Sequence, residues 1–296
     1  MALLKKILFI VNPISGGVDK SEMTAMVKAV CKKKEIELVT LNTAGKNDVE
    51  KIKAVLVNKK PDRVIVAGGD GTIKTVAAGV KGTDIPLAIL PLGSANGMVA
   101  NLNFPITQEE QLELAFTGTF KTIDLLQLNG ELCLHIADMG INAELVKNYE
   151  EGTLRGKLGY ALKTIPTLWN STYPFTFEIT ANGVTKDREG VLLAFANARS
   201  YGTGATINPE GKLDDGKMEI IIFKSLDVIE IFRTLGDTYD FDTEVVEILS
   251  TDKAVVKCKS PVPFQIDGEY IGETTEVTAS IFKEKLVLVV PEGFSL

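Results

Sequence analysis

Three glycine-rich turns are the part of this sequence best suited to binding an anion. They are Asn12-Pro13-Ile14-Ser15-Gly16-Gly17, Gly68-Gly69-Asp70-Gly71-Thr72 and Leu92-Gly93-Ser94-Ala95-Asn96-Gly97. Each follows a short apolar run that predicts a buried strand, and each is expected to lead into a helix. Glycines let backbone N–H groups approach a phosphate, and the positive N-terminal end of a helix adds to the attraction. The three turns together predict a phosphate site.

Asp70 points to a metal ion in the same place. A carboxylate inside a phosphate-binding turn would repel its ligand unless a cation bridges the two, and Asp oxygens suit Mg²⁺. A single such turn is often only a tight turn, and Asp70 alone could be the N-cap of a helix at Thr72. Neither a Walker motif nor a G-x-G-x-x-G motif after the first strand is present, so a nucleotide would be held by another loop design.

The elements that must position these turns alternate along the first third of the chain. Strand, helix, strand, helix is typical of a doubly wound parallel sheet, which binds ligands at the carboxyl ends of its strands. The expected strands are Leu3–Val11, Ile36–Leu41, Arg63–Ala67 and Pro86–Leu90, and the expected helices are Asp19–Lys34 and Asp48–Lys59.

The pattern changes after about residue 120 to short strands separated by turns, which predicts a second, antiparallel β-rich domain. We expect a nucleotide-binding α/β domain over 1–122 and a β-sandwich domain over 123–283, with the tail 284–296 returning to the first domain. The expected strands are Lys121–Leu128, Glu131–Ala137, Phe175–Ala181, Gly190–Asn197, Met218–Phe223, Val245–Leu249, Ala254–Cys258, Val262–Ile266, Glu276–Phe282 and Lys285–Val290, and the expected helices are Ile141–Asn148, Gly156–Trp169 and Asp227–Leu235.

Composition excludes several classes of protein. The net charge of −7 over 296 residues argues against a nucleic-acid binder, which would usually carry a basic excess. His135 is the only histidine, which argues against a histidine-based zinc site and a Ser-His-Asp triad. It stands in an apolar, strand-like run, so we expect it to lie in the core or at an interface. Cys31, Cys133 and Cys258 have neither metal nor disulfide spacing. Without a signal peptide or an apolar run of about 18 residues, we expect a cytoplasmic protein.

Taken together, the motifs resemble those of the diacylglycerol kinase catalytic-domain family, the bacterial soluble lipid kinases related to sphingosine and ceramide kinases. The GGDGT turn alone is shared with NAD kinases and related 6-phosphofructokinases, whereas the full set is more selective and spans nearly the whole chain. The matching pieces are Val11-Asn12-Pro13 with Ser15-Gly16, the turn Gly68–Thr72, Leu90–Asn96, Asp124, Leu213-Asp214-Asp215-Gly216 and Asp267-Gly268-Glu269.

The resemblance implies a role for each matching residue in an ATP-dependent kinase that uses Mg²⁺. Asp70 and Asp124 would organise the catalytic Mg²⁺, and Glu269 would be the general base that takes the proton from a lipid hydroxyl. Asp215 would hold a structural Mg²⁺ with the backbone carbonyls of Lys212 and Lys217. The implied nucleotide-binding residues are Asn12, Pro13, Ser15, Gly16, Thr43, Gly68, Gly69, Asp70, Gly71, Thr72, Ser94 and Asn96.

Three of these residues also have a purely structural interpretation. Asp124 could cap a backbone amide at a strand end, Glu269 follows an Asp-Gly hairpin turn, and Asp215 lies in an ordinary Asp-Asp-Gly turn. Their residue types alone favour these structural roles. The family match reverses that preference, because phosphoryl transfer is mostly positioning and charge neutralisation, and a carboxylate can assist a weak alcohol nucleophile.

The acceptor is the less determined part of the prediction. Bacterial members of the family usually carry Asp where this chain has Gly97, while sphingosine and ceramide kinases have a small residue there. The acceptor could therefore be diacylglycerol or a sphingoid lipid. An NAD kinase is a second interpretation, weakened because that family's Asn-Glu pair is absent. A non-catalytic nucleotide- or lipid-binding homologue is a third, which the presence of Asp70, Asp124 and Glu269 opposes.

A lipid acceptor implies contact with a membrane surface. The stretch Arg155–Trp169 combines cationic and apolar residues and could touch a bilayer, although such stretches are more often ordinary buried helices. We therefore expect at most a peripheral association with the inner face of the membrane and no nucleic-acid partner. A homodimer stays open, since the sequence does not determine the oligomeric state.

Overall fold

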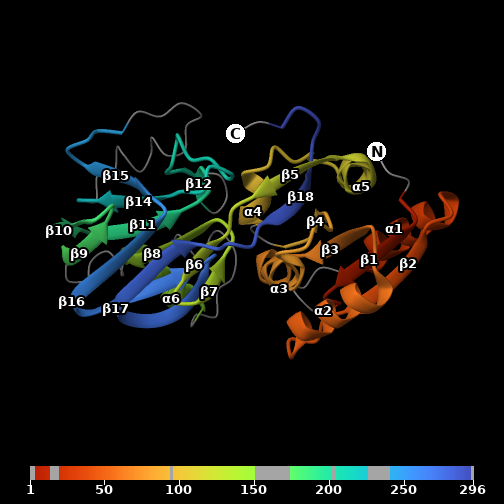
Figure 1. Cartoon of the computed structure of the whole chain (residues 1–296), viewed down its shortest axis with the longest axis horizontal. Coiled ribbons are helices and arrows are strands. Elements are labelled where there is room, and N and C mark those ends of the chain that lie inside the picture. The colour runs from red at the N-terminus through yellow and green to blue at the C-terminus, as the bar shows by residue number, and fades with distance from the viewer. Residues whose placement is uncertain are drawn as a thin grey trace. The chain divides into compact units, whose positions relative to one another are not determined.

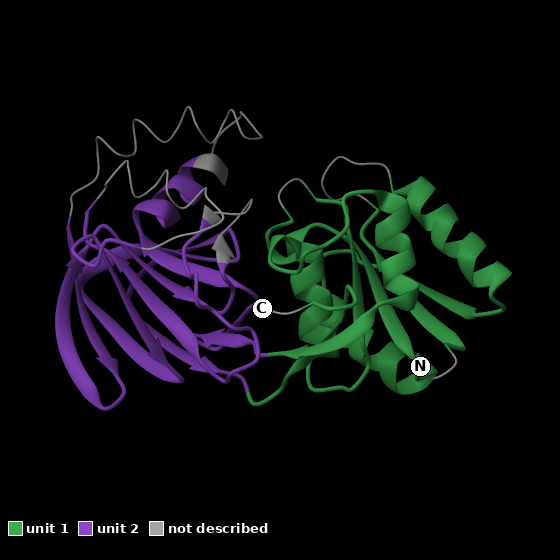
Figure 2. Cartoon of the chain, turned by 90° about the horizontal axis from the view of Figure 1, so that it is seen from above, with its two compact units in different colours: residues 1–123, 283–296 green, residues 124–282 purple. Residues whose placement is uncertain are grey.

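The fold is described from a computed structural model of the chain, over residues 4–13, 20–93, 96–150, 174–201, 205–225 and 241–294. The chain divides into two compact units, shown in different colours in Figure 2. Unit 1 comprises residues 1–123 and 283–296, and unit 2 comprises residues 124–282. The end of the chain therefore returns to the unit that contains its beginning.

Unit 1 is built on a sheet whose described strands run in the order β2-β1-β3-β4-β18-β5. β1, β2, β3 and β4 are parallel neighbours, and β18 is parallel to β4 but antiparallel to β5. The inner strands β1, β3, β4 and β18 are almost completely buried, as strands covered on both faces require, whereas the edge strands β2 and β5 are partly exposed. The bounds are Lys6–Val11 for β1, Glu37–Asn42 for β2, Arg63–Gly68 for β3, Leu87–Pro91 for β4, Thr119–Ile123 for β5 and Leu286–Val290 for β18.

Helices cover both faces of this sheet (Figure 1). α1 (Ser21–Lys33) and α5 (Gln108–Thr117) pack on the face that carries Ile7 and Phe9. α2 (Asp48–Lys59) and α3 (Asp70–Val80) pack against each other, and α3 contacts β3 and β4. The approach of α2 to α3 is close because Gly79 has no side chain: a Cβ there would lie 2.6 Å from Ile52. α4 (Gly97–Ala100) is a single turn.

Unit 2 contains an antiparallel sheet organised around the long strand β16 (Lys253–Ile266). β16 pairs with β17 (Glu269–Ile281) on one side, and on the other with β9 through residues 254–258 and with β8 through residues 264–266. The remaining strands are β6 (Leu126–Leu128), β7 (Glu131–Cys133), β8 (Ile136–Gly140), β9 (Phe175–Ala181), β10 (Val184–Gly190), β11 (Leu192–Ala196), β14 (Met218–Phe223) and β15 (Val246–Thr251), with the short pair β12 (Ser200–Tyr201) and β13 (Ala205–Thr206) beside them.

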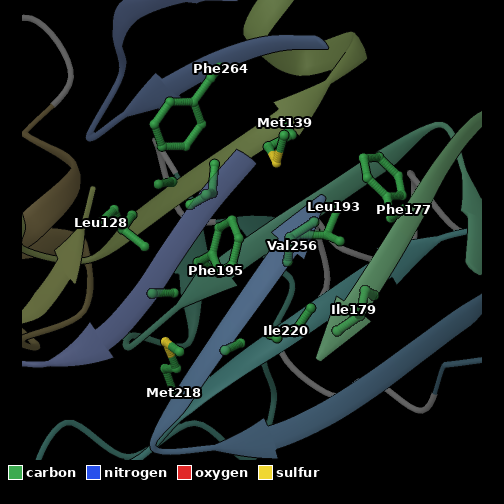
Figure 3. Close-up of a cluster of buried hydrophobic side chains, with 14 of the residues drawn as sticks. Leu128, Met139, Phe177, Ile179, Leu193, Phe195, Met218, Ile220, Val256 and Phe264 are labelled. Carbon is green, nitrogen blue, oxygen red and sulfur yellow. The ribbon is translucent and has the colours of Figure 1, made fainter. Parts of the chain in front are cut away.

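A large apolar core holds these strands together. Phe177, Phe195 and Ile220 are completely buried in it, together with side chains from β6, β8 and β16 (Figure 3). The helix α6 (Ile141–Glu150) packs on β8, β16 and β17. The predicted fold class, an N-terminal parallel-sheet domain followed by an antiparallel β-sandwich domain, is confirmed.

Several predicted strand bounds were wrong. The predicted strand Lys121–Leu128 is interrupted at Asp124, and the predicted strand Glu131–Ala137 is interrupted at Leu134 and His135. Ala254–Cys258 and Val262–Ile266 belong instead to one strand, whose ladder with β17 shifts register between Lys257 and Val262. Apolar character alone does not predict these two interruptions, because there the backbone N–H groups bond outside the strand ladder: that of Asp124 donates to the Leu213 carbonyl, and those of Leu134 and His135 donate to the Asp267 carboxylate. α5 was missed, although its capping box of Thr107 and Glu110 was visible as T-x-x-E.

Candidate functional site

In unit 1, the three strands that precede the glycine-rich turns end side by side at one edge of the sheet. β1, β3 and β4 are adjacent and parallel, with Val11 beside Ala67 and Gly68 beside Pro91. The turns that follow these strands therefore begin side by side at the carboxyl ends, where open α/β sheets bind ligands. Ser15, Gly16 and Ser94 lie outside the described residues.

The second and third turns pack backbone against backbone. A Cβ at Gly93 would lie 2.5 Å from the Cα of Gly69, so neither position has room for a side chain. The N–H of Leu92 donates to the carbonyl of Gly68 at 2.9 Å. Asn96, in the left-handed conformation, accepts from the Gly93 N–H at 2.9 Å and donates to the Gly93 carbonyl at 3.0 Å. The described residues of the two turns are thus packed and bonded to each other, and Asn96 bonds back to Gly93.

Asp70 is the first residue of α3 and is not its cap. The N-cap is Gly69, which has extended backbone and makes no side-chain capping bond. One Asp70 oxygen accepts from the Met98 N–H at 3.4 Å, which ties this carboxylate to the start of α4. Thr72 is buried, and a Cβ on Gly68 would collide with it at 2.6 Å. The partly exposed Asp70 carboxylate is a suitable hard-oxygen ligand for Mg²⁺.

Lys20 is a residue of this site that sequence reasoning missed. Its ammonium donates to the backbone carbonyl of Asn12 at 2.7 Å, and the residue is only 3% exposed. Burial lowers the pKa of the Lys20 ammonium. A signal was available: Lys20 stands at the N-terminal boundary of α1, where the helix dipole disfavours a cation. A buried cation at a phosphate edge supplies attraction for a polyanion.

Thr43 lies in the loop after β2, and its N–H donates to the Val11 carbonyl at 3.0 Å. This bond places the loop next to the first glycine-rich turn. The Thr43 hydroxyl is buried without a hydrogen-bond partner among the described residues. A buried hydroxyl of this kind carries a free-energy cost that a ligand could relieve. The same loop is held by Asp48, which accepts from the N–H groups of Ala44 and Gly45.

In unit 2, Asp124 and the turn 213–216 are brought together. One Asp124 carboxylate oxygen accepts from the Gly216 N–H at 2.6 Å, and the Asp124 N–H donates to the Leu213 carbonyl at 2.6 Å. Asn197 donates to the Asp124 carbonyl at 2.8 Å. Asp124 is completely buried. Its carboxylate caps the Gly216 backbone amide, which is the structural role considered from the sequence. Two of the predicted metal positions, Asp124 and Asp215, belong to one connected loop system.

Asp215 itself is exposed, and its carboxylate accepts from the Lys217 N–H at 3.0 Å. This bond closes the turn around the predicted structural cation position. One carboxylate with the carbonyls of Lys212 and Lys217 is an all-oxygen donor set, which fits a hard cation such as Mg²⁺. No cluster of three or more His, Cys, Asp or Glu side chains occurs within the described ranges.

Glu269 is exposed and begins β17, directly after the two-residue turn of Asp267 and Gly268. The Asp267 side chain is only 4% exposed, and its carboxylate accepts from the N–H groups of Leu134 and His135 at 3.0–3.1 Å. His135 Nδ1 lies 2.9 Å from Asp267 Oδ1. The expected core position of His135 is thus confirmed. An exposed carboxylate on an anchored turn is well placed to accept a proton.

Comparisons with known proteins agree with this arrangement. Residues 6–128 match the family model described as Diacylglycerol kinase catalytic domain, and residues 136–290 match the one described as YegS C-terminal NAD kinase beta sandwich-like domain. The two family models thus match the parallel-sheet domain and the β-sandwich domain in turn. The chain belongs to the family in which a diacylglycerol kinase catalytic domain precedes this β-sandwich domain.

Individual relatives are distant but cover nearly the whole chain. A protein of Staphylococcus aureus (strain MRSA252), named as a "putative lipid kinase", is 25% identical over 86% of this chain and 85% of its own. A structure titled as a "putative diacylglycerol kinase" from Bacillus anthracis str. Sterne has a TM-score of 0.80 and 23% identity over 100% of both chains. An Archaeoglobus fulgidus NAD kinase in complex with ATP has a TM-score of 0.54 and 13% identity, over 97% of this chain and 94% of its own. The last two show the fold.

Two stretches named in the sequence analysis cannot be compared with the structure. The stretch Arg155–Trp169 and the expected helix Asp227–Leu235 lie outside the described residues. Within the residues that the structure describes, no helix is long and apolar enough to cross a bilayer.

Proposed function

We propose that this chain is an ATP-dependent lipid kinase that transfers the γ-phosphate of ATP to the hydroxyl of diacylglycerol or a sphingoid lipid. The observation that carries the proposal is the packed pair of glycine turns in unit 1. Gly69 and Gly93 touch through their backbones, and the Asp70 carboxylate stands at the start of α3 beside them. Backbone N–H groups, a helix N-terminus and a metal-binding oxygen are what a nucleotide triphosphate needs.

In the proposed mechanism, the loops of unit 1 bind and orient the nucleotide. The turn at 68–72 would supply backbone N–H groups for the phosphates, with Asn12, Ser94 and Asn96 as further nucleotide contacts and Thr43 at the nucleoside. Lys20 adds positive charge behind the first turn. When bound, Mg²⁺ would neutralise charge on the transferring phosphate, with Asp70 and Asp124 as its carboxylate ligands, partly through water. Asp215 and the carbonyls of Lys212 and Lys217 would hold a second, structural Mg²⁺.

In the proposed chemical step, Glu269 is the general base. The lipid hydroxyl oxygen forms a bond to the γ-phosphorus, and the bond from that phosphorus to the β–γ bridging oxygen breaks, so ADP leaves. The proton of the hydroxyl passes to the Glu269 carboxylate. A general base at this position contributes about 10²–10⁴-fold to the rate.

The test is transfer from γ-labelled ATP by the purified full chain with Mg²⁺. Diacylglycerol, sphingosine, ceramide and phosphatidylglycerol are offered in mixed micelles, with NAD as a separate acceptor. We expect labelled lipid from the wild-type protein, its loss in Asp70→Asn, and a rate lower by about 10²–10⁴-fold but still measurable in Glu269→Gln. Labelled NADP, or no labelled lipid in any arm, would overturn the proposal.

A further inference from the structure

A buried polar chain leads from the Glu269 turn into the sheet. The Gly268 N–H donates to Gln265 Oε1 at 2.7 Å, and Gln265 Nε2 donates to Asp138 Oδ2 at 2.5 Å. Asn142 Nδ2 donates to the same Asp138 oxygen at 2.7 Å. Gln265 and Asp138 are both 0% exposed. Three elements, the β16–β17 turn, β8 and α6, are therefore joined through two completely buried side chains, Gln265 and Asp138, with the half-buried Asn142 at the α6 end.

The other side of the turn is fixed as firmly. The Asp267 carboxylate accepts from the N–H groups of Leu134 and His135, and the Asp267 N–H donates to the Ile136 carbonyl at 2.8 Å. Residue 134 is where the sheet ladder is interrupted between β7 and β8. Asp267 thus satisfies backbone amides that would otherwise be buried without partners, and in return they hold the turn in place.

The helix α6 also contacts the strand beyond Glu269. The Lys147 ammonium lies 5.5 Å from the centroid of the Tyr270 ring and 3.8 Å from a carboxylate oxygen of Glu273. α6 is therefore linked to this segment in two ways: indirectly before Glu269, because Asn142 and Gln265 bond the same Asp138 oxygen, and directly after Glu269, through Lys147. Buried networks of this kind rigidify the groups they hold, because each lost partner leaves a costly unsatisfied polar atom.

We propose that Gln265, Asp138 and Asp267 are positioning residues for Glu269. They fix the backbone on which the exposed Glu269 carboxylate stands, and they do so without touching the acceptor. This inference rests on the proposed function, in which Glu269 takes the hydroxyl proton. Small displacements of a catalytic group matter: an error of about 1 Å can cost on the order of 10²-fold in rate.

The test is a double-mutant cycle between Gln265→Met and Glu269→Gln, measured as kcat and KM in the labelled-ATP assay. Gln265→Met has nearly the same volume but neither accepts from Gly268 nor donates to Asp138. We expect kcat to fall about 10–100-fold while KM for ATP changes less than about twofold, since the nucleotide loops lie in unit 1. In the Glu269→Gln background the same change should lower kcat by less than about twofold, because no base is left to position.

Two further variants separate positioning from general damage. Asn142→Ala removes the donor to Asp138 at the half-buried end of this polar network. We expect the variant to fold and to lower kcat by roughly 3–10-fold, again without effect in the Glu269→Gln background. Arg188→Met removes the ion pair with Glu247 between β10 and β15, 2.7 Å long, and should leave kcat unchanged.

The outcomes are distinguishable. If the wild-type protein is active, one result would overturn the positioning role alone: Gln265→Met and Asn142→Ala lower kcat as much in the Glu269→Gln background as in the wild-type background. So would an unchanged kcat in both single variants. A wild-type protein that labels no lipid would overturn the proposed function, and the positioning role with it.

Discussion

The carboxylate of Asp124 accepts a hydrogen bond of 2.6 Å from the N–H of Gly216, 92 residues further along the chain. This bond gives Asp124 a structural role in addition to its proposed metal role. The two roles depend on different properties of the side chain. The backbone bond needs an oxygen acceptor, whereas a metal ligand of this class needs negative charge.

Asp124→Asn and Asp124→Ala should therefore behave differently. The amide oxygen of Asn can still accept from Gly216, so the free energy of unfolding should change little, whereas Ala leaves that buried N–H unpaired and should cost about 1–3 kcal/mol. Both variants should lose more than about 100-fold in kcat, because neither carries charge. Urea unfolding and labelled-ATP turnover measure the two effects. Wild-type turnover by Asp124→Asn would leave only the structural role.

Gly93→Ala should damage the fold of unit 1 as well as nucleotide binding. The added Cβ would lie 2.5 Å from the Cα of Gly69, so one of the two backbones must move. We expect a loss of about 1–3 kcal/mol in unfolding free energy, typical of an overpacked site, together with weaker ATP binding. Calorimetry of unfolding and ATP titration measure these changes.

Gly71→Ala is the matched comparison, since nothing lies within 4 Å of a Cβ there. It should fold with normal stability, because Ala is a better helix residue than Gly. The open space at this position is where we place the phosphates, so ATP affinity should still fall. Unchanged ATP affinity in Gly71→Ala would show that phosphate does not approach this face of the turn.

Thr43→Val should separate ligand binding from stability. The buried Thr43 hydroxyl has no partner among the described residues, so its replacement by a methyl should leave the unfolding free energy equal or slightly higher. KM for ATP should rise several-fold if the hydroxyl contacts the nucleoside. Thr119→Val is the control: its hydroxyl donates to the carbonyl of Val290 at 3.2 Å, so it should lose stability without a change in KM.

Acid should weaken the loop after β2 through Asp48. Burial alone would raise the pKa of Asp48, but hydrogen bonds from the N–H groups of Gly45 and Ala44 and the nearby Lys51 ammonium hold it below its ordinary value. A carboxylate with a lowered pKa contributes stability that is present above its unfolded pKa of about 3.9 and is lost as pH falls through the folded pKa.

Asp48→Asn tests this contribution. The variant should be about 1–2 kcal/mol less stable at pH 7, and the difference from wild type should shrink as pH falls below about 4. Urea unfolding at pH 7, 5 and 3 provides the measurement. A stability difference that stays constant across this range would mean that the charge of Asp48 contributes nothing.

The sequence by itself determined the two kinds of domain and the three turns. Strands such as Arg63–Gly68 are almost entirely apolar and are buried on both faces. Turn glycines are recognisable in a sequence because few other residues tolerate their geometry. Asp70, Asp124 and Glu269 could be selected only through the family pattern, because each residue type also has an ordinary structural use. The strands and the glycine turns could be predicted because the residues that determine them are neighbours in the sequence.

Only the tertiary structure decided what holds the site in shape. Gly69 touches Gly93, Asp124 caps Gly216, and Gln265 links Gly268 to Asp138. The side chains of Asp124, Gln265 and Asp138 are all 0% exposed, and they become buried only once distant strands have packed around them. A buried amide must find a partner wherever the fold supplies one, and sequence spacing does not show where that is. The same holds for the strand break at Asp124, whose N–H bonds to the distant Leu213 carbonyl, and for the buried Lys20 ammonium, which bonds to the Asn12 carbonyl.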